Sequence, residues 1–285
     1  MTFQKIQQGQ TQPLGLCVSN VQFAEGEARI SVTFQGEKLI SDVDSGRLLL
    51  GYRSPHDEYL SVGLVGYGAA YVISRFDPSQ GWLPTAIAGS HDNLLPNRTY
   101  QLAIRVIGQR IVLEVDSVRV LEHVLAAPLQ TGQLGLFTWG NRKIEFGKPT
   151  VAQEPGTVFV IMDFSDHYQE IYTEVIHTVI NEFPSLQAHH AGEVYGPGII
   201  LEDIQRDIVD AKIIVAEITP PNQNVFYELG YAHALGKPTI LLAEKDKALP
   251  FDISGYRCLF YEDSISGRRK VEEGLRKHLE AILQE

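Results

Sequence analysis

One glutamate stands alone in a short, otherwise uncharged segment that has the character of a helix. The segment Asn224–Ala232 reads Asn-Val-Phe-Tyr-Glu-Leu-Gly-Tyr-Ala and runs on to Gly236, after which the apolar run Thr239–Ala243 begins. A glycine at this point predicts the end of the helix, and the apolar run predicts a buried strand. A charge beside a loop at the edge of a parallel sheet lies where α/β proteins bind small ligands. Glu228 is therefore the first candidate for a catalytic residue.

A lone carboxylate in such a place can stabilise positive charge that develops in a transition state, or it can act as a nucleophile. Because Glu228 lies early in its helix, the helix dipole is expected to favour its ionised form. Asn222 and Asn224 stand at the start of the same helix, and both are candidate substrate contacts. At least one of them is expected to cap the helix. An isolated glutamate would be read as solvated, and only the surrounding segment favours the functional interpretation.

The residues after 155 alternate between strand and helix patterns. Expected strands are Thr157–Met162, Lys212–Ile218, Pro238–Ala243 and Cys258–Tyr261, and expected helices are Asp166–Phe183, Ile199–Asp210, Asn224–Leu235 and Arg268–Leu283. Such alternation predicts a parallel sheet with helices on both faces. The pattern changes near Val151–Gly156, so we expect one domain over residues 1–152 and a second over residues 156–285.

The carboxyl end of the first strand of this second domain offers further candidates. Phe164, Ser165 and Asp166 follow the strand, where parallel sheets meet their ligands. Ser165 and the amides after it could receive a phosphate, or Ser165 could simply cap the helix, and the two roles are compatible. These three residues are therefore predicted substrate contacts.

A loop rich in glycine, His190–Gly198, lies between a short strand and the helix that begins at Ile199. Tyr195 in this loop could stack on a ring of the substrate, although a solvent-facing tyrosine is about as compatible with the pattern. His189, His190 and Glu193 suggest a metal site, but adjacent histidines on a strand point to opposite faces. We therefore expect no metal ion.

The first 150 residues have the pattern of a β-sandwich. Seven segments are short, often alternating, and rich in β-branched or aromatic residues: Ala28–Phe34, Arg47–Tyr52, Tyr59–Val65, Tyr71–Phe76, Tyr100–Ile107, Ile111–Val115 and Gln133–Thr138. Turn residues separate them at regular spacing. Short strands of this kind without a helical period predict an antiparallel sandwich.

Five aromatic residues of the sandwich allow two interpretations. Tyr52, Tyr59, Tyr67, Trp82 and Trp139 could form a platform that binds a sugar, or they could fill the core and cover loops. Aromatic side chains contribute mainly through buried area, so the core interpretation is preferred. The sandwich could bind a ligand, which the sequence does not identify.

The net charge of the chain comes entirely from its second half. Residues 1–150 are neutral, whereas residues 151–285 carry 11 basic and 22 acidic side chains and so the whole net charge of −11. An acidic surface disfavours nucleic acid, whose binding depends on cations that neutralise phosphates. No apolar run approaches the roughly 20 residues of a membrane span, and the first ten residues lack the apolar core of a signal peptide. Only two cysteines are present, in different halves. The sequence thus predicts a cytoplasmic protein with no nucleic-acid or membrane partner.

Two resemblances extend these expectations. Residues Leu94–Ile104, Val115–Asp116 and Gly132–Phe137 give the first half, over residues 14–150, a resemblance to concanavalin A-like (laminin G-like) jelly rolls. This resemblance implies an all-β jelly-roll sandwich and no particular activity.

The second half resembles bacterial Toll/interleukin-1 receptor (TIR)-like domains and also nucleoside 2-deoxyribosyltransferases, which share a flavodoxin-like α/β layout. The segments Thr157–Ser165, Asp210–Thr219 and Asn224–Ala232 carry this resemblance, which covers residues 156–285. Both families use a glutamate at the position that Glu228 matches, and both act at the bond between a sugar C1′ and a nitrogen. The resemblance therefore implies N-glycosyl chemistry, with Asn222 and Asn224 placed to contact ribose hydroxyls.

The expected activity is an NAD+ glycohydrolase with NAD+ as substrate and no cofactor. Nicotinamide needs no acid to leave, because its ring nitrogen is already cationic in the bond, so a single carboxylate suffices. The added sandwich departs from the compact transferases and resembles TIR-bearing effectors of anti-phage defence, which self-associate through this domain to complete the pocket. A deoxyribosyltransferase or nucleoside hydrolase is the first alternative. A non-catalytic nucleotide-sensing scaffold is the second.

Overall fold

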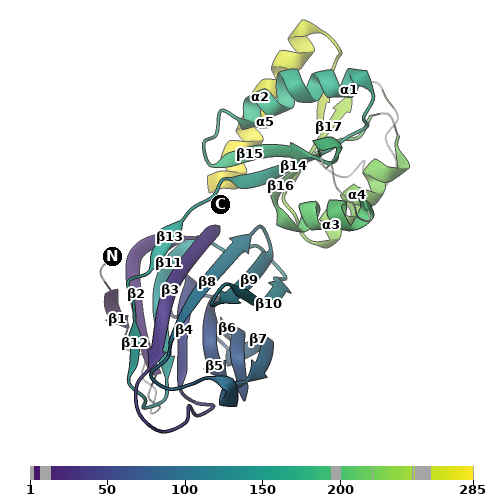
Figure 1. The fold of residues 1–285 in the computed structure, drawn as a ribbon. Helices are drawn as coiled ribbons and strands as arrows, with labels where there is room; N and C mark the ends of the chain where they lie inside the picture. The colour runs from purple at the N-terminus through teal and green to yellow at the C-terminus, as the bar shows by residue number, and fades with distance from the viewer. Residues whose placement is uncertain are drawn as a thin grey trace. The chain divides into compact units, whose positions relative to one another are not determined.

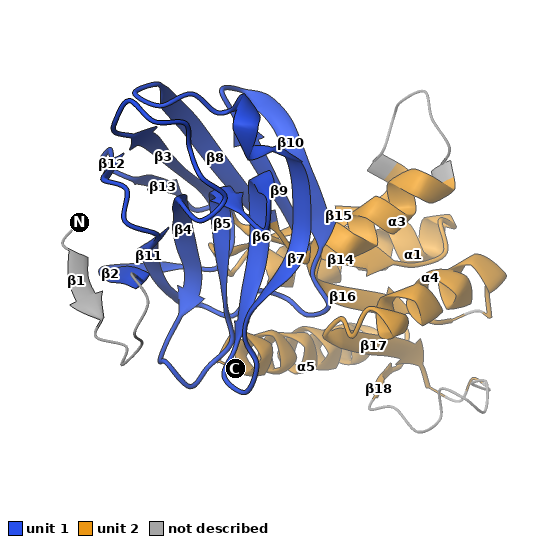
Figure 2. Ribbon diagram, turned by 90° about the horizontal axis from the view of Figure 1, so that it is seen from below, with its two compact units in different colours: residues 1–106, 110–154 blue, residues 107–109, 155–285 orange. Residues whose placement is uncertain are grey.

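The computed structural model of the 285-residue chain describes residues 3–6, 14–193, 200–219, 221–245, 247 and 258–284. The chain divides into two compact units, shown in blue and orange in Figure 2. Unit 1 comprises residues 1–106 and 110–154, and unit 2 comprises residues 107–109 and 155–285. Each unit has its own sheets and its own core.

Unit 1 is an antiparallel sandwich of two sheets (Figure 1). The first sheet has the order β1-β2-β11-β4-β5-β6-β7, and the second has the order β10-β9-β8-β3-β12, with β13 also paired to β3. The strands are β1 (Phe3–Ile6), β2 (Leu14–Phe23), β3 (Gly26–Phe34), β4 (Ser45–Tyr52), β5 (Tyr59–Gly66), β6 (Ala69–Asp77), β7 (Gly81–Ser90), β8 (Thr99–Ile107), β9 (Arg110–Val115), β10 (Val118–Val124), β11 (Gly132–Trp139), β12 (Ile144–Phe146) and β13 (Thr150–Ala152). A 3-10 turn, His91–Asn93, follows β7.

Apolar side chains cover both faces of the seven-stranded sheet. Successive side chains of a strand point to opposite faces, and all residues of β4 are buried. On β4, Leu48 and Leu50 join the core between the two sheets, where they meet Ile104 of β8. Leu49 points the other way and packs in a separate cluster with Tyr59 and Phe137. The outer face of this sheet is therefore covered by its own aromatic and aliphatic layer.

The expected antiparallel sandwich is confirmed, and all seven expected strands are present. Six further strands of the described residues, β1, β2, β7, β10, β12 and β13, were not among the expected segments. Strand β7 contains Pro84 and several small residues and lies at the edge of its sheet, and none of its side chains is fully buried. An edge strand that buries no face leaves no alternation in the sequence.

Unit 2 contains a five-stranded sheet in which every pairing is parallel, with the order β15-β14-β16-β17-β18 (Figure 1). Its strands are β14 (Gly156–Ile161), β15 (Leu186–His190), β16 (Ala211–Glu217), β17 (Thr239–Glu244) and β18 (Cys258–Tyr261). Its helices are α1 (Asp166–Ile171), α2 (His177–Ile180), α3 (Ile200–Asp210), α4 (Gln223–Ala234) and α5 (Ile265–Gln284), with a short 3-10 turn at Ala191–Glu193.

Helices cover both faces of this sheet, as the alternating pattern predicts. Val158 and Val160 of β14 pack with α1, α2 and α5 on one face, whereas Phe159 and Ile161 pack with α3 and α4 on the other. Buried strands with two apolar faces are typical of parallel sheets. The expectation of a parallel sheet with helices is thus confirmed.

The first helix departs from its expected form. A single helix was expected over Asp166–Phe183, but α1 passes into a π-helical turn at Tyr172–Ile176 and then into α2, which ends at Ile180. A π turn leaves the spacing of the apolar residues almost unchanged, so periodicity does not reveal it. In the described part of the chain, no helix combines the length and the apolar character that crossing a membrane requires.

Candidate functional site

The order of the parallel strands marks one place in unit 2 for a ligand. Strand β14 lies between β15 and β16, so the connections that leave β14 and β16 turn to opposite faces of the sheet. Ligands of such sheets bind in the crevice outside the carboxyl ends of these two strands. Helix α4, which carries Glu228, follows directly on β16.

Glu228 lies in the second turn of α4, beside the side chains that fix this helix on the sheet. Val225, Leu229 and Ala232 are buried, and full burial of a valine or leucine side chain stabilises by roughly 1.5–3 kcal/mol. Glu228 itself is half-buried. Among the residues that the structure describes, no hydrogen-bond donor and no cation contacts its carboxyl group.

Burial without a partner raises the pKa of Glu228 to about 7. The expectation that the helix dipole would favour its ionised form is therefore wrong. The dipole acts mainly within the first turn of a helix, and Glu228 lies beyond that turn. Desolvation penalises the charged form of a carboxyl group and here is the larger effect. Near neutral pH, Glu228 is consequently divided between its two protonation states.

The start of α4 is tied to the end of β14 through one asparagine. The Oδ1 of Asn222 accepts a hydrogen bond from the Asn224 backbone nitrogen at 2.9 Å and caps the helix. Its Nδ2 donates to Asp163 Oδ2 at 2.7 Å, and Asp163 Oδ1 accepts from the Ser165 nitrogen at 2.9 Å. The hydrogen bonds from Asn222 and Ser165 lower the pKa of Asp163, which keeps it ionised. Asn222 is thus the cap, and Asn224 is exposed.

Phe164, Ser165 and Asp166 are all exposed at the carboxyl end of β14. Ser165 occupies the N-cap position of α1, but its side chain makes no capping hydrogen bond, so the expected capping role is wrong. The backbone nitrogen of Ser165 donates to Asp163, which fixes the chain just before this helix. The ring of Phe164 is 52% exposed and lies 5.9 Å from that of His190 at the end of β15.

The two histidines of β15 point to opposite faces of the sheet, as successive residues of a strand do. The ring of His189 lies 5.8 Å from Phe159 on one face of the sheet, and that of His190 lies 4.4 Å from Tyr172 on the other. Within the described residues, no group of three or more His, Cys, Asp or Glu side chains could hold a metal ion. Tyr195, the remaining expected substrate contact, lies outside the described residues.

Sequence reasoning missed a buried carboxyl group at the end of β16. Glu217 is only 1% exposed. Its Oε1 accepts a hydrogen bond from the Thr219 nitrogen, and its Oε2 accepts one from the Tyr261 hydroxyl on β18, both at 2.9 Å. Burial raises the pKa of Glu217 to about 8 in spite of these hydrogen bonds. Glu217 is therefore mostly protonated at neutral pH.

A further carboxylate, Glu244, ends β17. It accepts hydrogen bonds from the Tyr168 hydroxyl at 3.1 Å and lies 3.2 Å from His167 Nε2. Burial and the nearby charges of Glu244, Glu217 and Asp163 raise the pKa of Tyr168, so these three acids face a common region. Glu217 and Glu244 are the last residues of their strands, and Asp163 lies two residues after β14. A carboxylate at the end of an apolar strand was the signal that the sequence offered.

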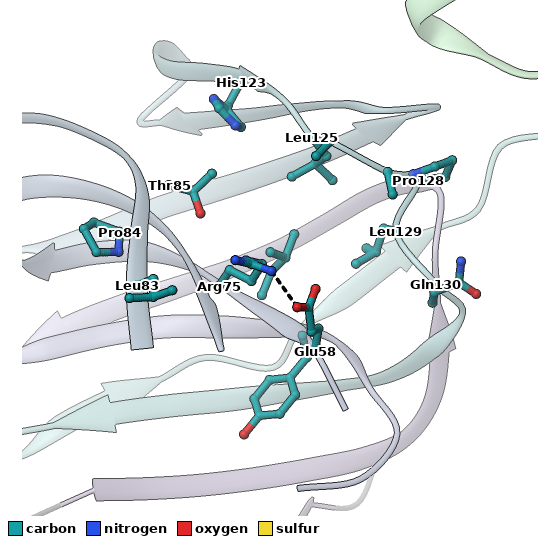
Figure 3. A pocket seen from close by; sticks show the side chains of 14 residues that line it. Glu58, Arg75, Leu83, Pro84, Thr85, His123, Leu125, Pro128, Leu129 and Gln130 are labelled. Atoms are coloured by element: carbon teal, nitrogen blue, oxygen red, sulfur yellow. Dashed lines mark hydrogen bonds and ion pairs between the residues drawn. The ribbon is translucent and has the colours of Figure 1, made fainter. Parts of the chain in front are cut away.

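Two of the pockets in the described structure lie in unit 1. One, of about 520 Å³, is lined mostly by apolar residues such as Leu83, Leu125 and Pro128, and it holds an ion pair between Glu58 and Arg75 (Figure 3). The side chains of Arg75 and Glu58 are 41% and 55% exposed, so both are open to solvent.

The second pocket, of about 410 Å³, changes the interpretation of the five aromatic residues. Tyr52 and Tyr59 are buried as preferred, but Tyr67, Trp82 and Trp139 line this pocket together. Trp82 and Trp139 also pack against the apolar cluster of this face, so the core interpretation holds for them in part, whereas Tyr67 belongs to no apolar cluster of the described residues. Tyr67 is 43% exposed because it lies in the tight turn between β5 and β6.

Comparisons with known proteins find similarity only between structures. No protein-family model matches the chain, and no curated protein matches it. A carbohydrate-binding module (CBM66) from Bacillus subtilis is similar over 51% of this chain and 88% of its own, with 13% identity and a TM-score of 0.41. A CMP N-glycosidase from Clostridium botulinum is similar over 43% of this chain and 98% of its own, with 16% identity and a TM-score of 0.36.

A galectin from Caenorhabditis elegans (LEC-6) is similar over 51% of this chain and 95% of its own length, with 16% identity and a TM-score of 0.32. At these values, none of the three identifies a function for this chain.

Proposed function

We propose that unit 2 hydrolyses the N-glycosyl bond of NAD+, with Glu228 as the catalytic carboxylate. The observation that carries this proposal is a half-buried carboxyl group with no partner among the described residues, on the helix that follows the switch between β14 and β16. A carboxyl group that is desolvated and left without a partner is costly for stability, and such groups gather at functional sites.

The proposed reaction follows from the chemistry of the bond. The bond between C1′ of the ribose and the pyridinium nitrogen breaks, and its electron pair neutralises the nicotinamide that leaves. Positive charge then develops on the ribose, and ionised Glu228 either stabilises that charge or bonds to C1′. Water supplies the new oxygen at C1′ and loses a proton, giving ADP-ribose. A cyclic product arises if a nitrogen of the adenine attacks instead.

The surrounding residues have proposed roles in holding the substrate. The link between Asp163 and Asn222 sets the position of α4 and therefore that of Glu228. Asn222 and Asn224 would contact ribose hydroxyls, and the exposed ring of Phe164 is available to stack on a ring of the substrate. Ser165, Asp166 and Tyr195 remain proposed substrate contacts. A bound pyridinium cation would lower the pKa of Glu228 and favour its ionised form.

The strand order 2-1-3-4-5 of unit 2 supports the flavodoxin-like, TIR-like layout that the sequence suggested. We propose self-association through this unit, since Phe164 and Tyr227 expose 52% of their surface each near the proposed site. An effector of anti-phage defence that depletes NAD+ is the biological role that this resemblance suggests.

A nucleoside hydrolase or 2-deoxyribosyltransferase is the second candidate, and the acidic strand ends favour it. Asp163 and Glu244 place two carboxylates beside the region, and carboxylates accept hydrogen bonds from sugar hydroxyls and repel phosphates. Incubation with a deoxynucleoside and a different free base separates the candidates, because only a transferase exchanges the bases.

The test uses the purified full chain with NAD+ over a range of protein concentrations, with products separated by chromatography. We expect nicotinamide and ADP-ribose from the unmodified protein and none from Glu228→Ala. Glu280→Gln, an exposed glutamate on α5, is the matched control and should keep full activity. A thermal shift with NAD+ but no product at any concentration would replace the proposal with a non-catalytic sensor or scaffold.

A further inference from the structure

The outer face of the seven-stranded sheet in unit 1 contains a cavity of about 410 Å³. Its lining combines Arg47 and Ser45 of β4 with the aromatic side chains of Tyr67, Trp82 and Trp139. This volume lies in the range of pockets that hold small molecules, which pair apolar walls with a few placed polar groups.

Arg47 is a buried cation with no counter-ion in the part of the chain that the structure describes. It is 3% exposed, and burial lowers its pKa to about 10, which still leaves it charged at neutral pH. Its Nη1 donates to the hydroxyls of Ser61 at 3.2 Å and Ser74 at 3.0 Å, and its Nη2 donates to Ser45 Oγ at 3.2 Å. No carboxylate pairs with it among the described residues.

A buried cation is costly when only neutral groups surround it. The hydroxyls hold the guanidinium in place but do not cancel its charge. An anion bound in the cavity would cancel it. The hydroxyl of Ser45 accepts from Arg47 and still has its own proton to donate to such an anion.

The backbone beside the cavity is strained. Val65, Gly66, Tyr67 and Gly68 all have positive φ, at 63°, 150°, 54° and 76°. For a β-branched residue such as Val65 this is a marked outlier. The Val65 carbonyl accepts hydrogen bonds from both Nε and Nη2 of Arg47. Strain of this kind persists where surrounding contacts impose it, and it gathers at ligand clamps.

The strained turn also shapes the cavity wall. A Cβ on Gly66 would lie 1.8 Å from Arg47 Nη2, so only glycine fits there. The turn presents the Tyr67 ring, whose centroid lies 5.7 Å from the Arg47 carbon Cζ. On another side, Phe137 lies 5.1 Å from the same carbon and 4.8 Å from the ring of Trp82. Trp82 Nε1 is buried and has no acceptor within the described residues.

We propose that this cavity binds a sugar acid, a hydroxylated ring that carries one carboxylate. The carboxylate lies toward Arg47 and Ser45, and the ring packs against the aromatic side chains. Asp42, which also lines the cavity, accepts hydrogen bonds from the hydroxyls. A neutral sugar leaves the Arg47 charge uncompensated. Ser41 donates to Asp42 Oδ1, and an aromatic acid has no hydroxyl to donate to the other oxygen of Asp42.

The two tryptophans of the chain, Trp82 and Trp139, both line this cavity, so intrinsic fluorescence reports on it directly. The full chain is titrated with glucuronate, galacturonate, glucose and benzoate. We expect a saturable change with at least one of the two sugar acids, at concentrations about tenfold lower than glucose or benzoate requires. Equal responses to glucose or benzoate, or no response to either sugar acid, would overturn the proposal.

Variants test the assignment of the cavity. Tyr67→Asn removes the ring but keeps a residue that tolerates positive φ, and it should weaken sugar-acid binding about tenfold. Ser117→Asn, at φ 65° in the turn between β9 and β10, is the matched control and should bind normally. Arg47→Gln should abolish binding if it folds. If it does not fold, unchanged binding by Tyr67→Asn is enough to reject the site.

Discussion

Glu217 and Glu228 are two glutamates of the same unit whose pKa values burial raises, and they differ in what surrounds them. Glu217 lies at the end of β16 with hydrogen bonds from Thr219 and Tyr261 to its two oxygens. Glu228 lies on the next helix, half-buried, and no partner reaches its carboxyl group within the described residues.

The difference separates a carboxyl group that holds a structure together from one that is free to react. The hydrogen bond from Tyr261 to Glu217 joins β18 to β16, and Thr219 occupies the other oxygen of Glu217. The oxygens of Glu228 have no such role, and a substrate can take them without breaking the fold. A raised pKa alone therefore does not identify a catalytic group, whereas a raised pKa on an unoccupied group does point to one.

The largest expected effect is on catalysis. Glu228→Gln should lower the rate of nicotinamide release about 10³-fold or more, because the charge that stabilises the transition state is lost. Glu217→Gln should lower it less than about tenfold, since that residue supports the sheet. Steady-state rates with NAD+ for both variants measure this contrast. Similar losses in the two variants would remove the distinction between the glutamates.

The second effect is on the pH dependence of the rate. NAD+ cleavage needs Glu228 ionised, and its pKa in the free enzyme is about 7. Below that value kcat/KM should fall about tenfold for each pH unit, and above it a plateau is expected. A profile that instead declines as pH rises through 7 would mean that protonated Glu228 is the active form, as an acid for a neutral leaving base.

The third effect is on stability. The folded pKa of Glu217 is about 8, well above the ordinary value of 4.5, so the folded state binds more protons than the unfolded state between these values. Stability should therefore fall as pH rises through this window, by up to about 1.4 kcal/mol per pH unit for this group. Glu217→Gln should remove that part of the slope, most clearly near pH 8, where Glu228 is mostly ionised and contributes little.

Denaturant unfolding followed by far-UV circular dichroism measures this slope. The α-helices of the described residues all lie in unit 2, whereas both tryptophans lie in unit 1 and report its unfolding separately. An unchanged slope in Glu217→Gln would show that another group titrates in this range.

The smallest effect is on the cap that positions Glu228. Asn222→Ala removes the helix cap and the hydrogen bond to Asp163, and it should cost about 1 kcal/mol of stability. Asn224→Ala, which removes no side-chain bond, should leave stability unchanged. If Asn222 sets the place of α4, its loss should also lower kcat. A variant with lower stability and full kcat would limit Asn222 to a structural role.

Several features of this protein are local and could be predicted from its sequence. The alternation of apolar strands and amphipathic helices indicated a parallel sheet, and the alternating strands of the first half indicated a sandwich. The cap at Asn222 and the helix end at Gly236 also follow from neighbouring residues, because capping and positive φ are properties of a few consecutive positions.

Other features depend on residues far apart in the chain, and only the tertiary structure decided them. Burial of Glu228 reversed the effect expected from its helix, Tyr261 reached Glu217 from another strand, and Arg47 met three serines from β4, β5 and β6. Periodicity indicates which face of an element is apolar, but it does not indicate what covers that face. The groups that pack against a buried side chain set its charge and its pKa. These groups come together only when the sheets and helices pack.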